Sequence, residues 1–231
     1  MADTKITPPP VVFDLDDTLL NATKAYLDAL QSMGISPDHP VFLQARGFVK
    51  TSLGPNNVSS HNRLLYFKKY LELKGEFSPE KTLHLMSLYE GALEKFLAEQ
   101  WQKLGRVDLL TRLKMRFPLA IITNENTRTQ MIKLRAIDPQ SHFFSFVVTS
   151  EEAGVEKPDL RIFNALEKLS GAPSQDWILV GDSWLNDMEP ALKLGARAIW
   201  SHEFLSEELK KQNHEVKIEI IEKLDELEGM I

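Results

Sequence analysis

The chain of 231 residues is 43% hydrophobic and 26% charged, with no cysteine and a formal net charge of −6 at pH 7. A chain of this size buries a core as one large domain or two unequal ones, and no apolar run approaches the ~20 residues that span a bilayer. The acidic balance disfavours a nucleic-acid polymer as partner, and the lack of thiols excludes disulfides, fits a cytoplasmic protein and leaves oxygen or imidazole as metal ligands.

The first half of the chain divides into a tail, a strand and a long helical stretch. Residues 1–10 are polar and then rich in proline, which predicts a flexible tail without the basic start and apolar core of a signal peptide. An apolar strand begins at Val11 and stops at Asp14. Residues 21–106 show helical periodicity, so they predict an all-helical insertion after this strand.

The second half alternates short apolar runs with amphipathic helices, which is typical of a parallel sheet with helical crossovers. We expect strands at residues 119–122, 144–148, 178–180 and 196–200. Residues 216–221 are a candidate edge strand, and residues 222–227 a candidate closing helix. The predicted fold is α/β, with a Rossmann-like parallel sheet core (11–20 and 107–231), helices on both faces and an inserted helical cap (21–106).

An acid cluster follows the first strand. Asp14, Asp16 and Asp17 place three carboxylates within four residues, where they repel one another unless something binds them. A divalent cation, or a reaction that uses a nucleophile and an acid, explains such a cluster. Because ligands of open α/β sheets bind at the carboxyl ends of the strands, the sequence predicts an active site here.

Three further polar signals follow later strands. Thr123 and Asn124 end the second strand and could hold a phosphate oxygen, although such a pair is more often a helix N-cap. Lys157 precedes a proline that fixes where the lysine points, although an isolated lysine is usually a surface residue. Asp182 follows a glycine at the end of the fourth strand, and Asp187 either joins it or caps the next helix.

These four signals in this order resemble the haloacid dehalogenase superfamily of hydrolases, and the resemblance covers nearly the whole chain. The run from Asp14 to Thr18 is similar to the nucleophile motif, Thr123 to the second motif and Lys157 to the third. Gly181-Asp182 with Asp187 is similar to the acidic fourth motif. The family's helical cap inserted after the first motif also matches this layout. One departure is Glu125, where many relatives have glycine.

The resemblance implies a magnesium-dependent phosphatase that acts through an aspartyl-phosphate. Asp14 would be the nucleophile, and Asp16 would act as general acid and then as general base. Mg²⁺ would be bound by Asp14, Asp182 and the backbone carbonyl of Asp16, with Asp187 in support. The groups expected to bind and neutralise the phosphoryl group are Thr123, Asn124 and Lys157.

Other reactions of the same scaffold stay open at this point. A phosphomutase also keeps the acid at Asp16, whereas a 2-haloacid dehalogenase needs neither that acid nor a metal. A non-catalytic binding protein would not retain every reactive group. The cap predicts a small phosphorylated metabolite as substrate, such as a nucleoside monophosphate or a sugar phosphate, with Arg63 and Tyr66 as candidate contacts on one helical face. The sequence predicts no membrane partner and does not indicate an oligomeric state.

Overall fold

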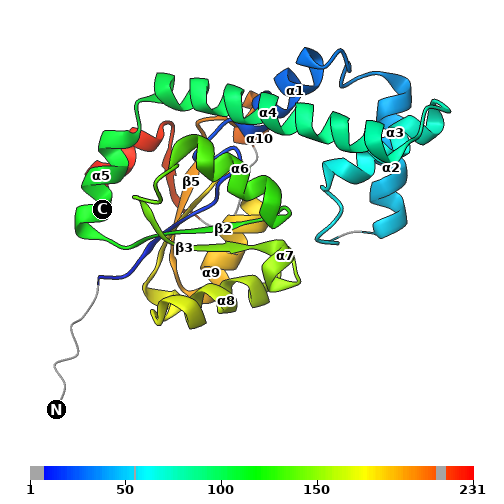
Figure 1. Cartoon of the computed structure of the whole chain (residues 1–231). Coiled ribbons are helices and arrows are strands. Elements are labelled where there is room, and N and C mark those ends of the chain that lie inside the picture. The colour runs from blue at the N-terminus through cyan, green and yellow to red at the C-terminus, as the bar shows by residue number, and fades with distance from the viewer. Residues whose placement is uncertain (1–7, 55, 212–216) are drawn as a thin grey trace.

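A computed structural model describes residues 8–54, 56–211 and 217–231 (Figure 1). It contains a parallel sheet of six strands in the order β3-β2-β1-β4-β5-β6. The strands are β1 (Val11–Phe13), β2 (Leu119–Thr123), β3 (Phe144–Thr149), β4 (Ile178–Gly181), β5 (Arg197–Ser201) and β6 (Glu219–Ile221). The predicted α/β fold is confirmed. Residues 1–7 of the predicted tail and residue 216 of the candidate edge strand lie outside the described residues.

Continuous apolar runs form the middle of the sheet. All residues of β1, β2 and β4 are buried, as expected for strands that are covered on both faces. Successive residues of β1 point to opposite faces: Val11 and Phe13 join one hydrophobic cluster, and Val12 joins the other. The candidate closing helix at residues 222–227 is instead a 3₁₀ helix, η3 (Leu224–Gly229).

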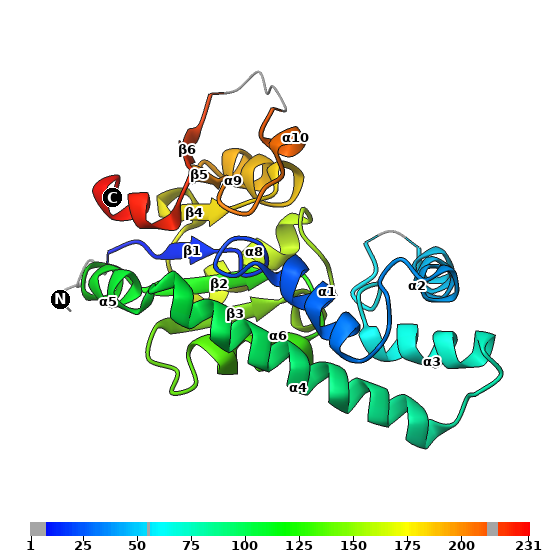
Figure 2. The ribbon, with the colours of Figure 1, turned by 90° about the horizontal axis from the view of Figure 1, so that it is seen from above.

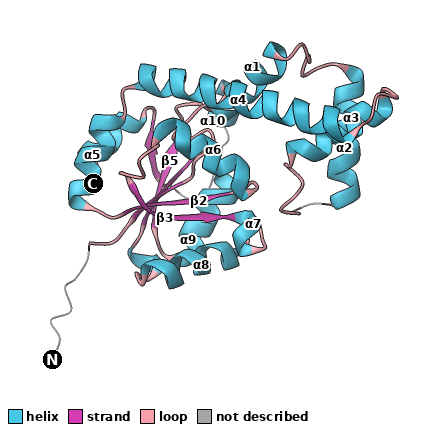
Figure 3. Cartoon of the chain, in the orientation of Figure 1, coloured by secondary structure: helices cyan, strands magenta, loops and turns pink. Residues whose placement is uncertain are grey.

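Helices cover both faces of the sheet (Figure 3). The core helices and turns are α5 (Val107–Arg116), α6 (Thr127–Ile137), α7 (Ser150–Ala153), α8 (Leu160–Ser170), η1 (Ser174–Asp176), η2 (Trp184–Met188), α9 (Glu189–Leu194) and α10 (Glu207–Lys210). Leucines of α5 belong to the cluster around Phe13, whereas Phe163 of α8 packs in the cluster around Val12. In the described ranges, no helix combines the length and apolarity needed to cross a bilayer.

The predicted all-helical insertion lies between β1 and β2. It consists of α1 (Ala22–Ser32), α2 (Pro40–Leu53), α3 (Arg63–Leu73) and α4 (Pro79–Leu104), here called the cap. Figure 2 shows α2 and α3 beyond the end toward which β1 points. Phe67 fixes the interior of the cap, with its ring centroid 6.4 Å from that of Phe42 and 5.7 Å from that of Tyr89. The boundaries of the cap at residues 21 and 106 stay a prediction.

The helix α4 joins the cap to the core. It packs against α1 and α3 in the cap and against α6 in the core. Two bidentate ion pairs support the second contact: Arg128 with Glu90 at 2.6 and 2.9 Å, and Arg135 with Glu94 at 2.6 and 2.5 Å. One helix therefore sets where the cap lies relative to the sheet.

Arg106, just after α4, ties the cap connection to the loop that carries the acids. Its side chain is 2% exposed and forms an ion pair with Glu203. Its guanidinium also donates to the carbonyl oxygens of Leu19 and, at 3.4 Å, Thr18. Because β1 leads directly into this loop, Arg106 helps to hold the loop against the core.

We expect Arg106→Met to lower the free energy of unfolding by about 3 kcal/mol, because the half-buried Glu203 carboxylate and the loop carbonyls lose their partner. Urea unfolding followed by circular dichroism measures the change. Arg112→Met is the matched control, since Arg112 of α5 forms an exposed pair with Glu228 of η3 and should matter little. Equal stability of the two variants would contradict the role given to Arg106.

Candidate active site

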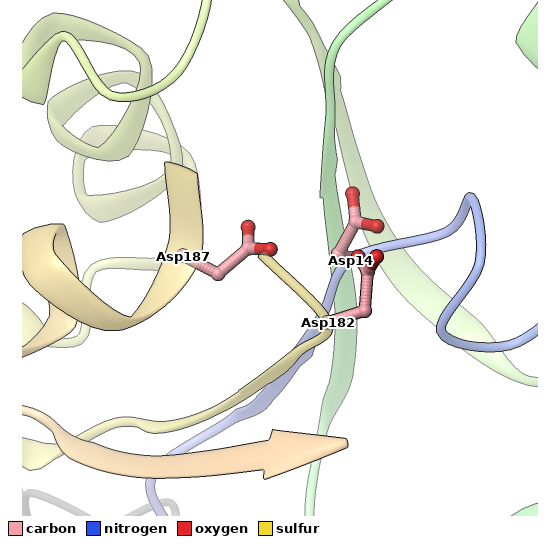
Figure 4. A group of neighbouring side chains, drawn as sticks. All are labelled: Asp14, Asp182 and Asp187. Atoms are coloured by element: carbon pink, nitrogen blue, oxygen red, sulfur yellow. The ribbon is translucent and has the colours of Figure 1, made fainter. Parts of the chain in front are cut away.

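The candidate site lies where β1 and β4 end side by side at the centre of the sheet. Asp14 directly follows β1, and Asp182 directly follows β4, its hydrogen-bonded neighbour. From β1 the sheet continues through β2 to β3 on one side, and from β4 it continues through β5 to β6 on the other side. The strand order therefore reverses between β1 and β4. Side chains at this point share a crevice at the carboxyl edge of the sheet. Figure 4 shows Asp14, Asp182 and Asp187 together there.

Lys157 brings a buried positive charge into this group. Its Nζ lies 2.6 Å from Asp14 Oδ1 and 2.6 Å from Asp187 Oδ1, and its side chain is 4% exposed. Burial disfavours the ammonium, but the two carboxylates outweigh burial and raise the pKa of Lys157. The lysine therefore stays charged and links two acids that would otherwise repel each other.

Asn124 fixes the backbone that carries this lysine. Its side-chain oxygen accepts from the backbone N–H of Lys157 at 2.7 Å, and its side-chain nitrogen donates to the carbonyl oxygen of Lys157 at 3.1 Å. One amide thus satisfies both polar groups of a loop residue 33 positions away in sequence. The structure brings Asn124 and Lys157 together as the sequence predicts, but the Asn124 side chain is occupied in positioning the lysine.

The acids carry more negative charge than Lys157 balances. Burial raises the pKa of Asp14 to about 7, with Asp187 and Asp16 adding to the rise and Lys157 opposing it. Burial, followed by repulsion from Asp14 and Asp187, raises the pKa of Asp182 to about 9. Thr18 lies between two of the acids, with its hydroxyl 3.4 Å from Asp14 Oδ2 and 3.3 Å from Asp182 Oδ1. A bound cation would remove this repulsion.

The donor set fits a hard divalent cation. Asp14, Asp182 and Asp187 each offer a carboxylate oxygen, and these oxygens lie within 4.8 Å of one another. Carboxylate oxygens are the ligands that Mg²⁺ takes in proteins. The sequence predicts only a supporting role for Asp187, whereas its carboxylate lies in the cluster itself. The side chain of Asp16 lines the same cavity but is paired with Lys133 and not with this cluster.

That pair holds Asp16 against the helix α6. The Nζ of Lys133 lies 2.8 Å from Asp16 Oδ1 and 2.6 Å from Asp16 Oδ2, and Gln130 Nε2 donates to Asp16 Oδ2 at 3.2 Å. The same amide donates to the hydroxyl of Thr123 at 2.6 Å. One turn of α6 therefore fixes both Asp16 and Thr123, two residues that the sequence places in the site.

Glu125, directly after the Thr123-Asn124 pair, has an unusual backbone. Its φ is 137°, in a region that residues with side chains rarely adopt. Its backbone N–H donates to Ser150 Oγ at 2.9 Å, and its carbonyl accepts from the same hydroxyl at 3.2 Å. The peptide is thus held by Ser150, and its N–H is not directed toward a ligand.

The carboxylate of Glu125 connects the core to the cap. Its Oε2 lies 2.6 Å from Nη1 of Arg63, the first residue of α3, and both side chains are largely buried. The guanidinium carbon of Arg63 lies 4.6 Å from the ring centroid of Tyr26 and 5.8 Å from that of Tyr66. Arg63 is therefore already paired and stacked, and this contact is the direct charged link between the two halves of the site.

A cavity of about 460 Å³ separates the acids from the cap. Its floor contains the strand-end residues, and its roof contains Arg63 and Tyr66, the two predicted substrate contacts. Tyr66 is 1% exposed, and its hydroxyl donates to the carbonyl oxygen of Ser60. Both residues line the cavity, but each already has partners within the protein. A cavity of this size suits a small metabolite.

Gly181 allows Asp187 to pack directly against the backbone in the floor of the cavity. A Cβ on Gly181, the last residue of β4, would lie 2.5 Å from Cβ and 2.6 Å from Oδ2 of Asp187. Real atoms do not pack that closely, so Asp187 occupies the space that a side chain at residue 181 would need. The glycine of the predicted fourth motif thus has a steric role.

Several contacts in the site are not predicted by the sequence. Lys133, Gln130 and Ser150 carry no motif, and Thr18 gives no hint that it bridges two acids. A signal exists for the first two: they lie three residues apart on α6, and both are buried on a face that otherwise packs apolar side chains. A polar pair on a core-facing stripe indicates buried partners.

Comparison with known proteins identifies relatives over most of the chain. A family model described as haloacid dehalogenase-like hydrolase matches residues 11–201. The ribulose-1,5-bisphosphate 5-phosphatase of Halopiger xanaduensis is 33% identical over 82% of this chain and 82% of its own length. The glyceraldehyde 3-phosphate phosphatase of Pyrococcus abyssi is 28% identical over 82% of this chain and 79% of its own length.

Solved structures share the fold. The HAD hydrolase YfnB of Bacillus subtilis, bound to magnesium, superposes with a TM-score of 0.66 at 22% identity, covering 97% of this chain and 98% of its own. A 2-haloacid dehalogenase of Pseudomonas syringae gives a TM-score of 0.65 at 21% identity, covering 96% of both chains. At these identities the likeness concerns the arrangement of strands and helices alone.

The Glu125 and Arg63 contact can be tested by stability. We expect Glu125→Gly to be destabilising by about 2 kcal/mol, because relief of backbone strain returns about 1–3 kcal/mol while an unpaired buried charge costs about 3–5 kcal/mol. Urea unfolding of the single and double variants measures the coupling. The double variant with Arg63→Met should recover most of the loss, whereas strictly additive losses would mean that the two side chains are not coupled.

Proposed function

This chain belongs to the haloacid dehalogenase-like hydrolases, and from that premise we propose that it is a magnesium-dependent phosphatase of small phosphorylated metabolites. The observation that carries the proposal is the placement of Asp14. Its carboxylate lies at the end of β1 on the floor of the cavity, 2.6 Å from the Lys157 ammonium. A nucleophile beside a fixed cation is what attack on an anionic phosphoryl group requires.

The first half of the reaction transfers the phosphoryl group to Asp14. A carboxylate oxygen of Asp14 forms a bond to phosphorus while the bond from phosphorus to the leaving oxygen breaks. Asp16 donates a proton to that oxygen, so an alcohol departs. Lys157, with its backbone held by Asn124, stays beside the attacking carboxylate and attracts the transferring oxygens.

The second half restores the enzyme. Asp16, now a carboxylate, takes a proton from water as the water oxygen attacks phosphorus, and the bond between phosphorus and Asp14 breaks to release inorganic phosphate. Lys133 and Gln130 contact Asp16 in the structure, and they hold its carboxylate in place at the cavity for this step. Thr123, whose hydroxyl is oriented by Gln130, would accompany Lys157 in holding the phosphate oxygens.

Asp14, Asp182 and Asp187 would hold Mg²⁺, with the backbone carbonyl of Asp16 as a further oxygen ligand. When bound, the ion neutralises the charge that keeps an anionic nucleophile and a phosphate dianion apart. Two observations support this assignment: the three carboxylates lie within 4.8 Å of one another, and their burial raises the pKa values of Asp14 and Asp182.

The cap supports a small substrate. Arg63 and Tyr66 roof the cavity, and α4 holds the cap over the strand ends, so a folded phosphoprotein would not reach Asp14. Nucleoside monophosphates and sugar phosphates both fit this limit. The names of the two relatives, a ribulose bisphosphate phosphatase and a glyceraldehyde phosphate phosphatase, favour sugar phosphates.

Phosphate release tests the proposal directly. We expect the chain to hydrolyse sugar phosphates or nucleoside monophosphates with magnesium, to lose activity with EDTA and to prefer them to phosphopeptides in kcat/KM. Asp14→Asn should remove turnover while keeping the circular dichroism spectrum, because the nucleophile is lost and the fold is not. Asp28→Asn, which removes a half-buried acid of α1 that is paired with Lys24 and lies outside the cavity, is the charge-matched control. Normal turnover by folded Asp14→Asn would exclude the proposed intermediate.

The role of Asp16 predicts a dependence on the leaving group. An alkoxide needs a proton, whereas 4-nitrophenolate leaves without one, so Asp16→Asn should slow alkyl phosphates by about 10²–10⁴-fold and aryl phosphates far less. Single-turnover kinetics isolates the phosphorylation step for each substrate. Equal losses on both substrates would show that Asp16 does not donate the proton.

A further inference from the structure

A group of positive side chains lines the cap side of the cavity, opposite the acids. Arg46 lies on α2, and His61 and Arg63 lie at the start of α3. Lys50, one turn after Arg46 on α2, lines a second cavity of about 500 Å³. This cavity adjoins the first, since both are lined by His61, Asn124 and Lys157. A molecule bound at Lys157 therefore lies at the boundary of the two cavities, the second of which extends to Lys50 on α2.

The charges of these residues are unequally balanced. Arg63 has its own counter-ion, Glu125, at 2.6 Å. Neither Arg46 nor Lys50 forms an ion pair with any residue in the described parts of the chain. The fields of Glu156 and Glu125 reach Lys50 without a direct contact, and burial raises the pKa of the Glu156 carboxyl. Arg46 and Lys50 are thus two cations beside the cavities that have no direct counter-ion among the described residues.

The pKa of His61 responds to these nearby cations. Burial lowers its pKa to about 4, and the cations Arg63, Lys50 and Arg46 add to the decrease. The imidazole is consequently neutral near pH 7, and it faces the cavity as a hydrogen-bonding group without a charge of its own. A neutral imidazole beside these cations can form a hydrogen bond to an anion without changing the charge of the site.

We propose that the substrate carries a second anionic group at the end remote from the reacting phosphoryl group, and that Arg46 and Lys50 bind it. The proposal rests on the proposed phosphatase function and narrows its substrate class to bisphosphates or phosphorylated carboxylates. Arg46 and Lys50 are four residues apart on α2, so their side chains lie on one face and can contact the same group. Arg63, already paired with Glu125, shapes the roof between the two anions.

A matched substrate series tests the proposal. The probes are 3-hydroxypropyl phosphate, 2-carboxyethyl phosphate and propane-1,3-diyl bisphosphate, which differ only in the remote group, together with the corresponding five-carbon series. We expect kcat/KM to be at least about tenfold higher for an anionic end than for a hydroxyl end at one chain length, as for a charge-assisted hydrogen bond. The carboxylate and phosphate probes distinguish the two sources of negative charge.

Substitutions of Arg46 and Lys50 test whether these side chains cause the preference for an anionic end. Arg46→Gln and Lys50→Gln should each reduce it about tenfold while leaving the hydroxyl-ended probe within about threefold of wild type. Lys81→Gln is the control, because it removes the same charge from an exposed cap position outside both cavities. Equal kcat/KM for all three ends in wild type, or equal losses on all probes in Arg46→Gln, would overturn the proposal.

A binding measurement separates this proposal from the phosphatase function. Asp14→Asn should bind the bisphosphate more tightly than the monophosphate in a calorimetric titration, and adding Arg46→Gln should remove the difference. This result is independent of turnover. Failure of wild type to hydrolyse any probe would contradict the phosphatase function, whereas equal binding of the two probes by Asp14→Asn would contradict the remote anion site.

Discussion

The site depends on the contact between the Lys157 ammonium and two buried carboxylates, those of Asp14 and Asp187. Parallel strands bring several acids to one edge of the sheet, and burial makes their mutual repulsion stronger than it would be in water. A fixed cation lowers that repulsion, and Asn124 fixes the cation by binding its backbone on both sides. Because Lys157 balances only part of the charge, Asp14, Asp182 and Asp187 form a group in the floor that could hold a further positive ion.

The strand-end residues were predictable because their positions follow from local rules. An apolar run that stops at Asp14, a second that stops at Thr123 and a third that stops before Asp182 must meet when the sheet forms. The sequence therefore identifies the floor without knowledge of side-chain contacts. It also predicts the layer architecture, since the buried strands and amphipathic helices have different periodicities.

The remaining contacts depend on how separate elements pack. Glu125 and Arg63 are 62 residues apart and meet only when the cap lies over the core. Lys133 reaches Asp16 because α6 packs with one face toward the strand ends. Asp187 enters the acid cluster because it lies in η2, a short π-helix after β4, and residue spacing does not reveal this local geometry. Tertiary packing, rather than local propensity, decides these partners.

The close approach of Gly181 and Asp187 has an evolutionary consequence. Since even a methyl group at residue 181 would displace the acid, the floor tolerates little sequence change without losing its charge arrangement. The roof is different: Arg46 and Lys50 line the two cavities from α2, and a Cβ added at Gly47 on the same helix would meet no atom within 4 Å. Substitutions that change the substrate range can therefore accumulate in the inserted helices while the reaction stays the same. Specificity and chemistry thus diverge in separate parts of one chain.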